Sequence, residues 1–341
     1  MNKIKLHKLF LDKSLLITGG TGSLGNELVK IFLRDFKLKR LIIFSRDELK
    51  QSEMIKVYSK KDPRGILRFF IGDVRDLKRL ILASEHVDFL VHAAALKHVH
   101  SGEYNPFEVI KTNIIGTQNV IDAVCYNKIP KSIFLSTDKA VSPINLYGAT
   151  KLAGEKLFIA SNNYSIKSKF SVVKYGNVFN SRGSVFPVFL KQKKEDELLK
   201  LTHKEMTRFN ISLNEGVDLV SFALKDMRGG ETYVPKMRSL KIIDLVKIFK
   251  PKKGYKIIGI RPGEKLHEEL ISASDSSAKI EFDKYFVVLP STIDNKNILK
   301  FIKNFKSQKG KILKNLFQYD SLNAAKFLTI KELEKIAFNL N

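Results

Sequence analysis

Short apolar runs recur along the first half of the chain, and longer amphipathic stretches separate them. A run of three or four apolar residues bounded by glycine or polar residues is typical of a buried strand, whereas residues 106–126 and 146–160 are long enough for helices. This alternation predicts an α/β fold: a Rossmann-type, doubly wound parallel sheet with helices on both faces. The predicted strands are 15–17, 41–44, 68–71, 89–91, 133–135 and 170–173.

The pattern changes after residue 178, where the expected elements become shorter and less regular. We expect a Rossmann domain over residues 1–178 and a smaller α/β substrate-binding domain over residues 179–341, some segments of which return to the first domain. A loop at 180–184 has the turn residues to wrap a ligand. The Lys-rich stretch 295–314 is predicted to be a peripheral helix, with binding to a membrane surface as the minor alternative. Other predicted elements of this half are strands at 208–213, 231–235 and 256–260, a helix at 215–227 and a helix that begins at 240.

The first predicted strand runs directly into a glycine-rich turn and then into a helix that reaches Phe32. Glycines in such a turn permit a tight bend, close approach to a pyrophosphate and tight packing of the helix. The helix N-terminus offers free amides and the positive end of a dipole to the phosphates. The turn therefore predicts a dinucleotide site formed by Gly19, Thr21, Gly22, Ser23, Leu24 and Gly25.

The end of the second predicted strand carries Ser45 and Arg46, and Lys50 follows one helical turn later. An NAD enzyme usually places an acid here to hold the ribose hydroxyls, whereas a guanidinium suits a 2′-phosphate. This strand end favours NADP as the cofactor, and Asp47 leaves NAD open.

The next two predicted strands end in residues that we also expect to contact the cofactor. Asp73 and Val74 follow the third strand and are predicted to lie near the adenine. Small residues after the fourth strand, beginning with Ala93, let the cofactor lie close to the backbone, and Lys97 can reach a phosphate or a ribose.

The fifth predicted strand ends in Thr137, Asp138 and Lys139, at the edge where open α/β sheets bind ligands. A predicted helix then brings Tyr147 and Lys151, which are four residues apart and share one helical face. Because an ammonium favours phenolate over phenol, we expect Lys151 to lower the pKa of Tyr147 toward that of a useful base. These five residues are the predicted catalytic set.

No group of His, Cys, Asp and Glu has the spacing of metal ligands, so the sequence predicts no metal site. His92 and His98 are interpreted as residues that pack or support the site.

Composition limits the partners and the compartment. The net charge of +25 could indicate nucleic acid or a membrane surface, but the lysines are spread along the whole chain among acids, and no nucleic-acid-binding motif occurs. We interpret most of this charge as solvated lysine-rich faces, a few of which serve an anionic dinucleotide and a nucleotide sugar. No apolar run reaches the roughly 18 residues of a membrane span. Residues 1–13 lack the features of a signal peptide and are expected to lead directly into the first strand, and the single cysteine, Cys125, suits a cytoplasmic protein.

Several motifs together resemble the extended short-chain dehydrogenase/reductase family, and within it the soluble UDP-N-acetylglucosamine 4,6-dehydratases that invert C5 of the sugar. The resemblance extends through about residue 335. The chain departs from the pattern at Lys174, where the family usually has Arg, and at 203–205. The motifs that carry the resemblance are residues 45–51, 72–76, 92–99, 136–140, 182–185, 206–209 and 259–268.

The resemblance implies an NADP-dependent hydro-lyase acting on UDP-N-acetylglucosamine at the start of pseudaminic acid synthesis for flagellin or surface glycosylation. Tyr147, with Lys151, would take the proton of the sugar 4-hydroxyl, and Thr137 would bond O4. Lys139 would remove the C5 proton, provided that burial and cofactor charge lower its pKa, and Asp138 would protonate the departing 6-hydroxyl.

The resemblance also implies further contacts and an assembly. Family members form hexamers, so we expect a homo-oligomer, either a hexamer or a dimer. Val178 and Arg182 are predicted to join the cofactor site. Lys97, Asn177, Thr202, Arg261 and Glu264 are predicted to bind the substrate, with Arg261 and Glu264 on the UDP part and Thr202 near the uracil.

Two other functions stay open. A UDP-sugar 4-epimerase would share the fold, the cofactor turn and Tyr147 with Lys151, but it needs only the ketone, so the Asp138-Lys139 pair argues for dehydration. A non-catalytic nucleotide-binding or scaffold protein would be expected to have lost Tyr147 or Lys151, and both are present.

Overall fold

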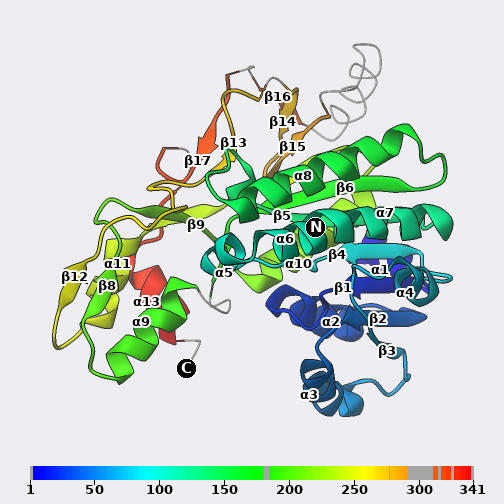
Figure 1. Ribbon diagram of the computed structural model, residues 1–341, viewed down its shortest axis with the longest axis horizontal. Coiled ribbons are helices and arrows are strands. Elements are labelled where there is room, and N and C mark those ends of the chain that lie inside the picture. Colours follow the sequence, from blue (N-terminus) through cyan, green and yellow to red (C-terminus); the bar gives the residue numbers. More distant parts are fainter. Residues whose placement is uncertain are drawn as a thin grey trace.

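The structure is a computed structural model that describes residues 3–179, 184–275, 277–290, 310–313, 316–323 and 326–338. Its main feature is a ten-stranded sheet in the order β16-β14-β15-β10-β6-β5-β4-β1-β2-β3 (Figure 1). The strands from β3 to β10 are parallel, and β15, β14 and β16 continue the sheet antiparallel. The ten strands are β1 (Ser14–Thr18), β2 (Arg40–Ser45), β3 (Leu67–Ile71), β4 (Phe89–His92), β5 (Lys131–Thr137), β6 (Lys169–Tyr175), β10 (Thr232–Pro235), β14 (Lys279–Glu281), β15 (Tyr285–Val288) and β16 (Lys311–Ile312).

The predicted α/β class is confirmed, and apolar side chains fill both faces of the sheet. On one face α2 (Ser23–Asp35), α3 (Glu48–Tyr58) and α10 (Leu213–Asp226) cover side chains of β1, β2 and β5. On the other face α4 (Leu77–Ala83), α7 (Gly116–Tyr126) and α8 (Leu146–Ala160) cover alternate residues of the same strands. This two-sided burial explains why the strands read as continuous apolar runs.

The N-terminal residues differ from the expectation. Residues 1–13 were predicted to lead directly into the first strand, but α1 (Lys3–Phe10) precedes it. The buried side chains Leu6 and Phe10 turn inward, and the Phe10 ring lies 4.9 Å from Phe32 and 5.3 Å from Phe89 between ring centroids. Alternation of Lys with apolar residues on so short a segment does not distinguish a helix from an extended chain, so the packing decides.

The helix predicted over 106–126 is interrupted. It consists of α6 (Pro106–Ile110), a π-helical turn over Lys111–Ile115 and then α7. Single π turns are frequent at functional sites because they redirect side chains. This one redirects Asn113, whose contacts are described with the site.

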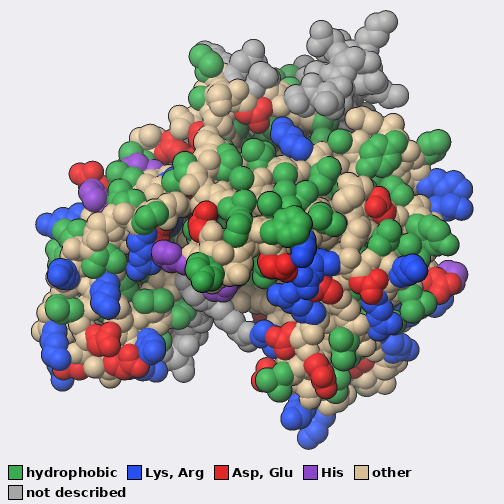
Figure 2. All heavy atoms as spheres, in the orientation of Figure 1, with side chains coloured by type: hydrophobic (Ala, Val, Ile, Leu, Met, Phe, Trp, Pro, Cys, Tyr) green, Lys and Arg blue, Asp and Glu red, His purple; other side chains and the backbone are tan. Residues whose placement is uncertain are grey.

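A second lobe packs beside the carboxyl edge of the main sheet and has an apolar core of its own (Figure 1). It contains a three-stranded sheet of β7 (Asn177–Val178), β9 (Thr207–Ile211) and β11 (Arg238–Lys241), and the pair β8 (Leu199–Leu201) and β12 (Tyr255–Ile257). Its helices are α9 (Val185–Lys194), α11 (Ile242–Phe249) and α13 (Ile330–Phe338). In Figure 2 the surface is hollowed between this lobe and the part of the main domain that holds α2 and α3.

The C-terminal half does not stay in the second lobe. Its strands β10, β14, β15 and β16 belong to the main sheet, and α10 packs on one face of that sheet. The strand β13 (Glu269–Ile271) pairs with β17 (Tyr319–Asp320) beside it. Most of the predicted Lys-rich helix at 295–314, and residues 180–183 of the predicted loop at 180–184, lie outside the described residues. The described end of that predicted helix is a strand, β16, because Ile312 pairs with Ile280 of β14. Among the described residues, no helix combines the length and the apolar character needed to cross a bilayer.

The packing of α1 generates a test of stability. Replacing the fully buried Phe10 with Ala removes a ring that contacts three other aromatic rings, so the free energy of unfolding should fall by about 3–5 kcal/mol. Urea denaturation followed by circular dichroism measures this change. Ile4→Ala on the same helix is the matched control, because the Ile4 side chain is 80% exposed and should change stability little; equal effects of the two substitutions would contradict the packing of α1.

Candidate active site

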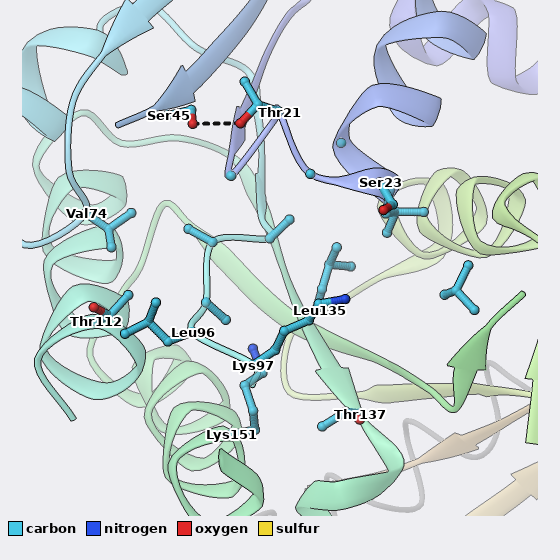
Figure 3. A pocket seen from close by; sticks show the side chains of 18 of the residues that line it. Thr21, Ser23, Ser45, Val74, Leu96, Lys97, Thr112, Leu135, Thr137 and Lys151 are labelled. Carbon is cyan, nitrogen blue, oxygen red and sulfur yellow. Dashed lines mark hydrogen bonds between the residues drawn. The ribbon is translucent and has the colours of Figure 1, made fainter. Parts of the chain in front are cut away.

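A cavity of about 600 Å³ lies at the carboxyl ends of the parallel strands. Its walls come from the turns after β1 and β4, where the strand order changes direction, and from β2, β5, α8 and β7. Such a switch point is where open α/β sheets bind ligands. In Figure 3, Thr21 and Ser45 lie on one side of the cavity, and Lys97 and Lys151 lie near the end of β5 that carries Thr137.

The glycine turn is held by close backbone contacts. Gly19 has a φ of +64°, and a Cβ there would lie 2.7 Å from the Ala94 backbone. A Cβ at Gly25 would lie 2.4 Å from the Gly20 carbonyl oxygen, so only glycine lets α2 begin this close to the turn. These contacts leave the first amides of α2 at the cavity, the arrangement that suits a pyrophosphate.

The predicted NADP-selecting residues all line the cavity. Ser45 is hydrogen-bonded to Thr21 in the cavity wall, at 2.8 Å between the hydroxyl oxygens (Figure 3). Arg46 lies 3.6 Å from Asp73, between Nη1 and Oδ2, and its side chain is 54% exposed, so a ligand can reach the guanidinium. Asp47 accepts a hydrogen bond from the Lys50 amide, as the N-cap of α3, and another from the Lys50 ammonium.

His92 is fully buried at the end of β4. Nδ1 lies 2.6 Å from the Thr18 hydroxyl oxygen, and Nε2 lies 3.1 Å from that of Thr117. Burial, together with the charge of Lys151, lowers the pKa of His92 to about 3, so the imidazole is neutral. His92 therefore holds β1, β4 and α7 together. In the described part of the chain, no group of three or more His, Cys, Asp and Glu side chains could hold a metal ion.

Asn113 is a residue whose role the sequence analysis missed. Its side chain accepts from the Leu96 amide at 2.8 Å, donates to the Leu96 carbonyl at 2.9 Å and donates to Thr150 at 3.0 Å. It thereby ties the loop that carries Lys97 to α8, which carries Tyr147 and Lys151. The sequence signal for this role was weak, because Asn113 is a single polar residue in a predicted helix. Its side chain points inward only because of the π turn.

The turn after β5 and the start of α8 are in close backbone contact. A Cβ at Gly148 would lie 2.1 Å from the Lys139 carbonyl oxygen. The Asn145 side chain caps α8 by accepting from the Gly148 amide at 2.7 Å. Because Tyr147 and Lys139 both lie beside this contact, it sets the distance between the two side chains.

Asp138 is fully buried and is the centre of the turn's polar contacts. Its Oδ1 accepts from the Thr137 hydroxyl at 2.8 Å and from the Lys139 ammonium at 3.0 Å. Lys139 also lies 3.3 Å from Glu268, a buried residue just before β13. Burial disfavours the charge on Lys139, but Asp138 and Glu268 outweigh it and raise its pKa. The lowered pKa expected for Lys139 is therefore wrong for the protein on its own.

The expected effect of Lys151 on Tyr147 is also wrong. Burial raises the pKa of the Tyr147 phenol to about 12, and the cation that partly offsets this is Lys139. Burial lowers the pKa of Lys151 to about 7, although Glu155 opposes the change. The ammonium of Lys151 lies over the Phe134 ring, 3.8 Å from its centroid. In this buried site desolvation exceeds the charge effect that helical spacing suggested.

Lys174, a position at which the family resemblance implies Arg, forms a buried ion pair. Its ammonium lies 2.9 Å from Glu155, and the other Glu155 oxygen accepts a hydrogen bond from Ser136. All three side chains are buried. This group ties β5 and β6 to α8 one turn beyond Lys151, so the substitution is accommodated by an ion pair in the core.

Every described residue predicted to bind the cofactor lines the cavity, as do Thr137, Lys139 and Asn177. Thr202, Arg261 and Glu264 do not line it. Arg261 and Glu264 lie 3.7 Å apart, with exposed fractions of 48% and 31%, on a loop fastened to α8 because Asn145 donates to the Gly263 carbonyl at 2.8 Å. Arg182 lies outside the described residues.

A family model described as "Polysaccharide biosynthesis protein" matches residues 15–290, which is most of the chain and includes the whole cavity lining. The chain belongs to this family.

Individual proteins also match this chain along nearly its full length. A Campylobacter jejuni protein named UDP-N-acetylglucosamine 4,6-dehydratase (inverting) is 49% identical over 96% of this chain and 98% of its own. A Rickettsia bellii protein named UDP-glucose 4-epimerase is 40% identical over 98% and 97%. The solved structure of Pen from Bacillus thuringiensis superposes with a TM-score of 0.86 at 35% identity and covers 97% of this chain and 98% of its own.

The contact between α8 and the turn after β5 can be tested in this family member. Gly148→Ala places a methyl group 2.1 Å from a backbone oxygen, so α8 must shift by about an ångström, and a displacement of that size costs roughly 10²-fold in activity. Steady-state kinetics and thermal unfolding, measured together, separate this shift from loss of the fold. The control is Gly216→Ala in α10, where the new Cβ meets only the end of the Leu24 side chain at 3.2 Å; near wild-type activity of Gly148→Ala would show that the contact is not needed.

Proposed function

We propose that this protein is a UDP-N-acetylglucosamine 4,6-dehydratase that inverts C5 of the sugar and uses NADP. The relative from Campylobacter jejuni that carries this name shares nearly half of its residues with this chain. The observation that carries the proposal is the ion pair of Asp138 and Lys139 beside Tyr147. Dehydration needs an acid and a base in addition to the group that handles O4, and this site offers all three.

The ion pair can supply the acid and the base together. Moving one proton from Lys139 Nζ to Asp138 Oδ1, across 3.0 Å, converts ammonium and carboxylate into amine and carboxylic acid. The amine then takes the proton from C5, the acid protonates the departing 6-hydroxyl, and the pair returns to ammonium and carboxylate.

The elimination requires a ketone at C4, because the ketone acidifies the C5 proton. Tyr147 is a neutral phenol in the protein alone, but the positive charge of a bound oxidised nicotinamide would favour its phenolate. As the phenolate, Tyr147 takes the proton of the 4-hydroxyl, and the nicotinamide would supply the acceptor for the C4 hydride that later returns to C6. Thr137 is hydrogen-bonded to both Tyr147 and Asp138. After Lys139 returns a proton to C5 from the opposite face, Asp138 has lost one proton and Tyr147 has gained one. Thr137 lies between them and offers a path by which this proton returns from Tyr147 to Asp138.

The choice of NADP rests on the end of β2. Arg46 is accessible at the cavity, and a guanidinium can bond a 2′-phosphate in a bidentate manner. Asp47, the acid that would suit the ribose hydroxyls of NAD, is engaged in capping α3 and in pairing with Lys50.

A UDP-sugar 4-epimerase is the second candidate, because the Rickettsia bellii relative carries such a name. Epimerisation uses oxidation at C4 and rotation of the sugar, so Tyr147 and the cofactor suffice. Asp138 and Lys139 would then have no task at C5 and O6. Release of water from the substrate distinguishes the two activities.

The finer assignments are part of the same proposal. Arg261 and Glu264 would hold the UDP part, Thr202 the uracil, and Asn177 and Lys97 the region where sugar and cofactor meet, with Arg182 beside the cofactor. The product, UDP-2-acetamido-2,6-dideoxy-β-L-arabino-hex-4-ulose, would enter pseudaminic acid synthesis in the cytoplasm. We also propose a homo-oligomer, the assembly that the family resemblance implies.

The cofactor assignment predicts what the purified protein contains. Because the hydride returns to the sugar within each turnover, the cofactor is not a product, and the protein should be isolated with NADP(H) bound. Denaturation followed by mass spectrometry of the released nucleotide identifies it. Arg46→Asp should shift the bound nucleotide toward NAD, whereas Arg68→Asp on β3, outside the cavity lining, should not; finding only NAD in the wild type would overturn the choice of NADP.

The roles at O4 and C5 predict different failures in two variants. Tyr147→Phe should abolish both ketone formation and NADPH absorbance. Lys139→Ala should still allow slow reduction of bound NADP⁺ but lose water release by about 10²–10⁴-fold, the usual contribution of a general base. Rapid absorbance measurements and NMR of the product in D₂O, with deuterium expected at C5 in the wild type, follow the two steps. Near wild-type dehydration by Lys139→Ala would place the base elsewhere.

A further inference from the structure

Lys139 is held by a second carboxylate that reaches it from a distant part of the chain. Glu268 lies just before β13, is only 2% exposed, and places Oε1 at 3.3 Å from Lys139 Nζ. The same Glu268 oxygen lies 3.8 Å from Nε of Arg208, a residue of β9. Lys139 therefore lies between the carboxylates of Asp138 and Glu268, which come from opposite halves of the chain.

Glu268 is fixed in this position by its backbone. Its amide donates to the Ser321 hydroxyl at 2.9 Å, and the Ser321 amide donates back to the Glu268 carbonyl at 2.8 Å. The Ser321 hydroxyl also lies 2.7 Å from that of Thr207, and Arg208 donates to the Thr207 and Leu266 carbonyls. The Glu268 backbone and the Arg208 side chain are therefore both held by hydrogen bonds, and the fold directs the Glu268 carboxylate at Lys139.

Burying the Glu268 carboxylate costs free energy of desolvation, and its second oxygen accepts no hydrogen bond from a described residue that would offset this cost. Among the described residues, Oε2 of Glu268 is buried without a hydrogen-bond partner, and so is Oδ2 of Asp138. A buried charge is retained at such a cost when it is paired or has a function. Here the pairing consists of Lys139 and Arg208, of which Lys139 alone lines the cavity.

We propose that Glu268 is a positioning residue for Lys139: its carboxylate holds the amine against Asp138 and keeps it protonated until the sugar is bound. The role of this protonation in removing the C5 proton rests on the proposed dehydratase function. The contact between Glu268 and Lys139 does not depend on that function. Glu268 touches neither the cavity nor the cofactor turn in the described residues, so it acts through Lys139.

The groups that face Lys139 determine the sign of the effect. Asp138, on the same turn, and Glu268, from the segment before β13, favour the ammonium, whereas burial and Arg208 of β9 favour the amine. Tyr147 of α8 is a neutral phenol at ordinary pH because its pKa is raised to about 12. Removing the charge of Glu268 should therefore lower the pKa of Lys139, so that a larger fraction is amine at any given pH.

The experiment measures the protonation of Lys139 directly. Brief acetylation with acetic anhydride labels only neutral amines, and mass spectrometry of the peptide that contains Lys139 gives its labelling rate at each pH. In the wild type the midpoint for Lys139 should lie above that of the exposed Lys56 in the same samples. In Glu268→Gln the midpoint should move to lower pH, so that the labelling rate relative to its plateau rises by about tenfold or more below the wild-type midpoint.

Two variants and one internal comparison separate positioning from a merely structural role. Glu268→Asp keeps the charge and should leave the midpoint near that of the wild type. Glu269→Gln is the matched control, because this neighbouring carboxylate faces Ser142 at 3.4 Å rather than Lys139. If Glu268→Gln fails to fold, the wild-type midpoint of Lys139 relative to Lys56 still tests the proposal.

The outcomes are distinct from those for the proposed function. An unchanged midpoint in folded Glu268→Gln, or a wild-type midpoint at or below that of Lys56, would overturn the positioning role even if the enzyme dehydrates its substrate. Conversely, a shifted midpoint in a protein that releases no water would support the positioning role and refute the dehydratase.

Discussion

The site depends on one close contact, in which the first turn of α8 lies directly against the backbone after β5. Only a residue without a side chain fits at Gly148, where a Cβ would meet the Lys139 carbonyl oxygen at 2.1 Å. Asn145 closes the same junction from two sides, since it caps α8 and donates to the Gly263 carbonyl. The phenol of Tyr147, the amine of Lys139 and the loop that precedes Glu268 are thus fastened to one point, and none can move without the others.

Electrostatics follow from this enclosure. The site contains two groups of paired charges: Glu155 with Lys174, and Asp138 and Glu268 with Lys139 and Arg208. Within each group the cations and carboxylates offset one another's desolvation cost. Lys151 lies over the Phe134 ring, and burial lowers its pKa to about 7. In the protein alone, Lys151 therefore loses its charge at a lower pH than Lys139 does.

The sequence predicted the elements that local pattern determines. The bounds of α8 agree with the amphipathic stretch 146–160, and the glycine turn lies at the cavity because glycine spacing specifies a backbone shape. Contacts between segments that are distant in the sequence could not be predicted in this way. Glu268 is one acid in a polar stretch, and its approach to Lys139 requires β13, β17 and β9 to assemble first. Asn113 depends on a π turn, which no hydrophobic period reveals. The predicted pKa shifts of Tyr147 and Lys139 were wrong for opposite reasons. Burial of Tyr147 exceeds the effect of the nearby cation, whereas Asp138 and the distant Glu268 exceed the effect of burial on Lys139.

The sharing of the main sheet between the two halves of the chain bears on its synthesis. Strand β6 has β10 as its outer neighbour, and β15 and β14 follow beyond it. When a ribosome has released only the residues up to β6, that strand is an unpaired apolar edge, and the face later covered by α10 is exposed to water. Most of the N-terminal half therefore leaves the ribosome well before β10 and α10 are available to complete its sheet. During this interval the unfinished sheet is a surface on which chaperones can act and neighbouring chains can aggregate.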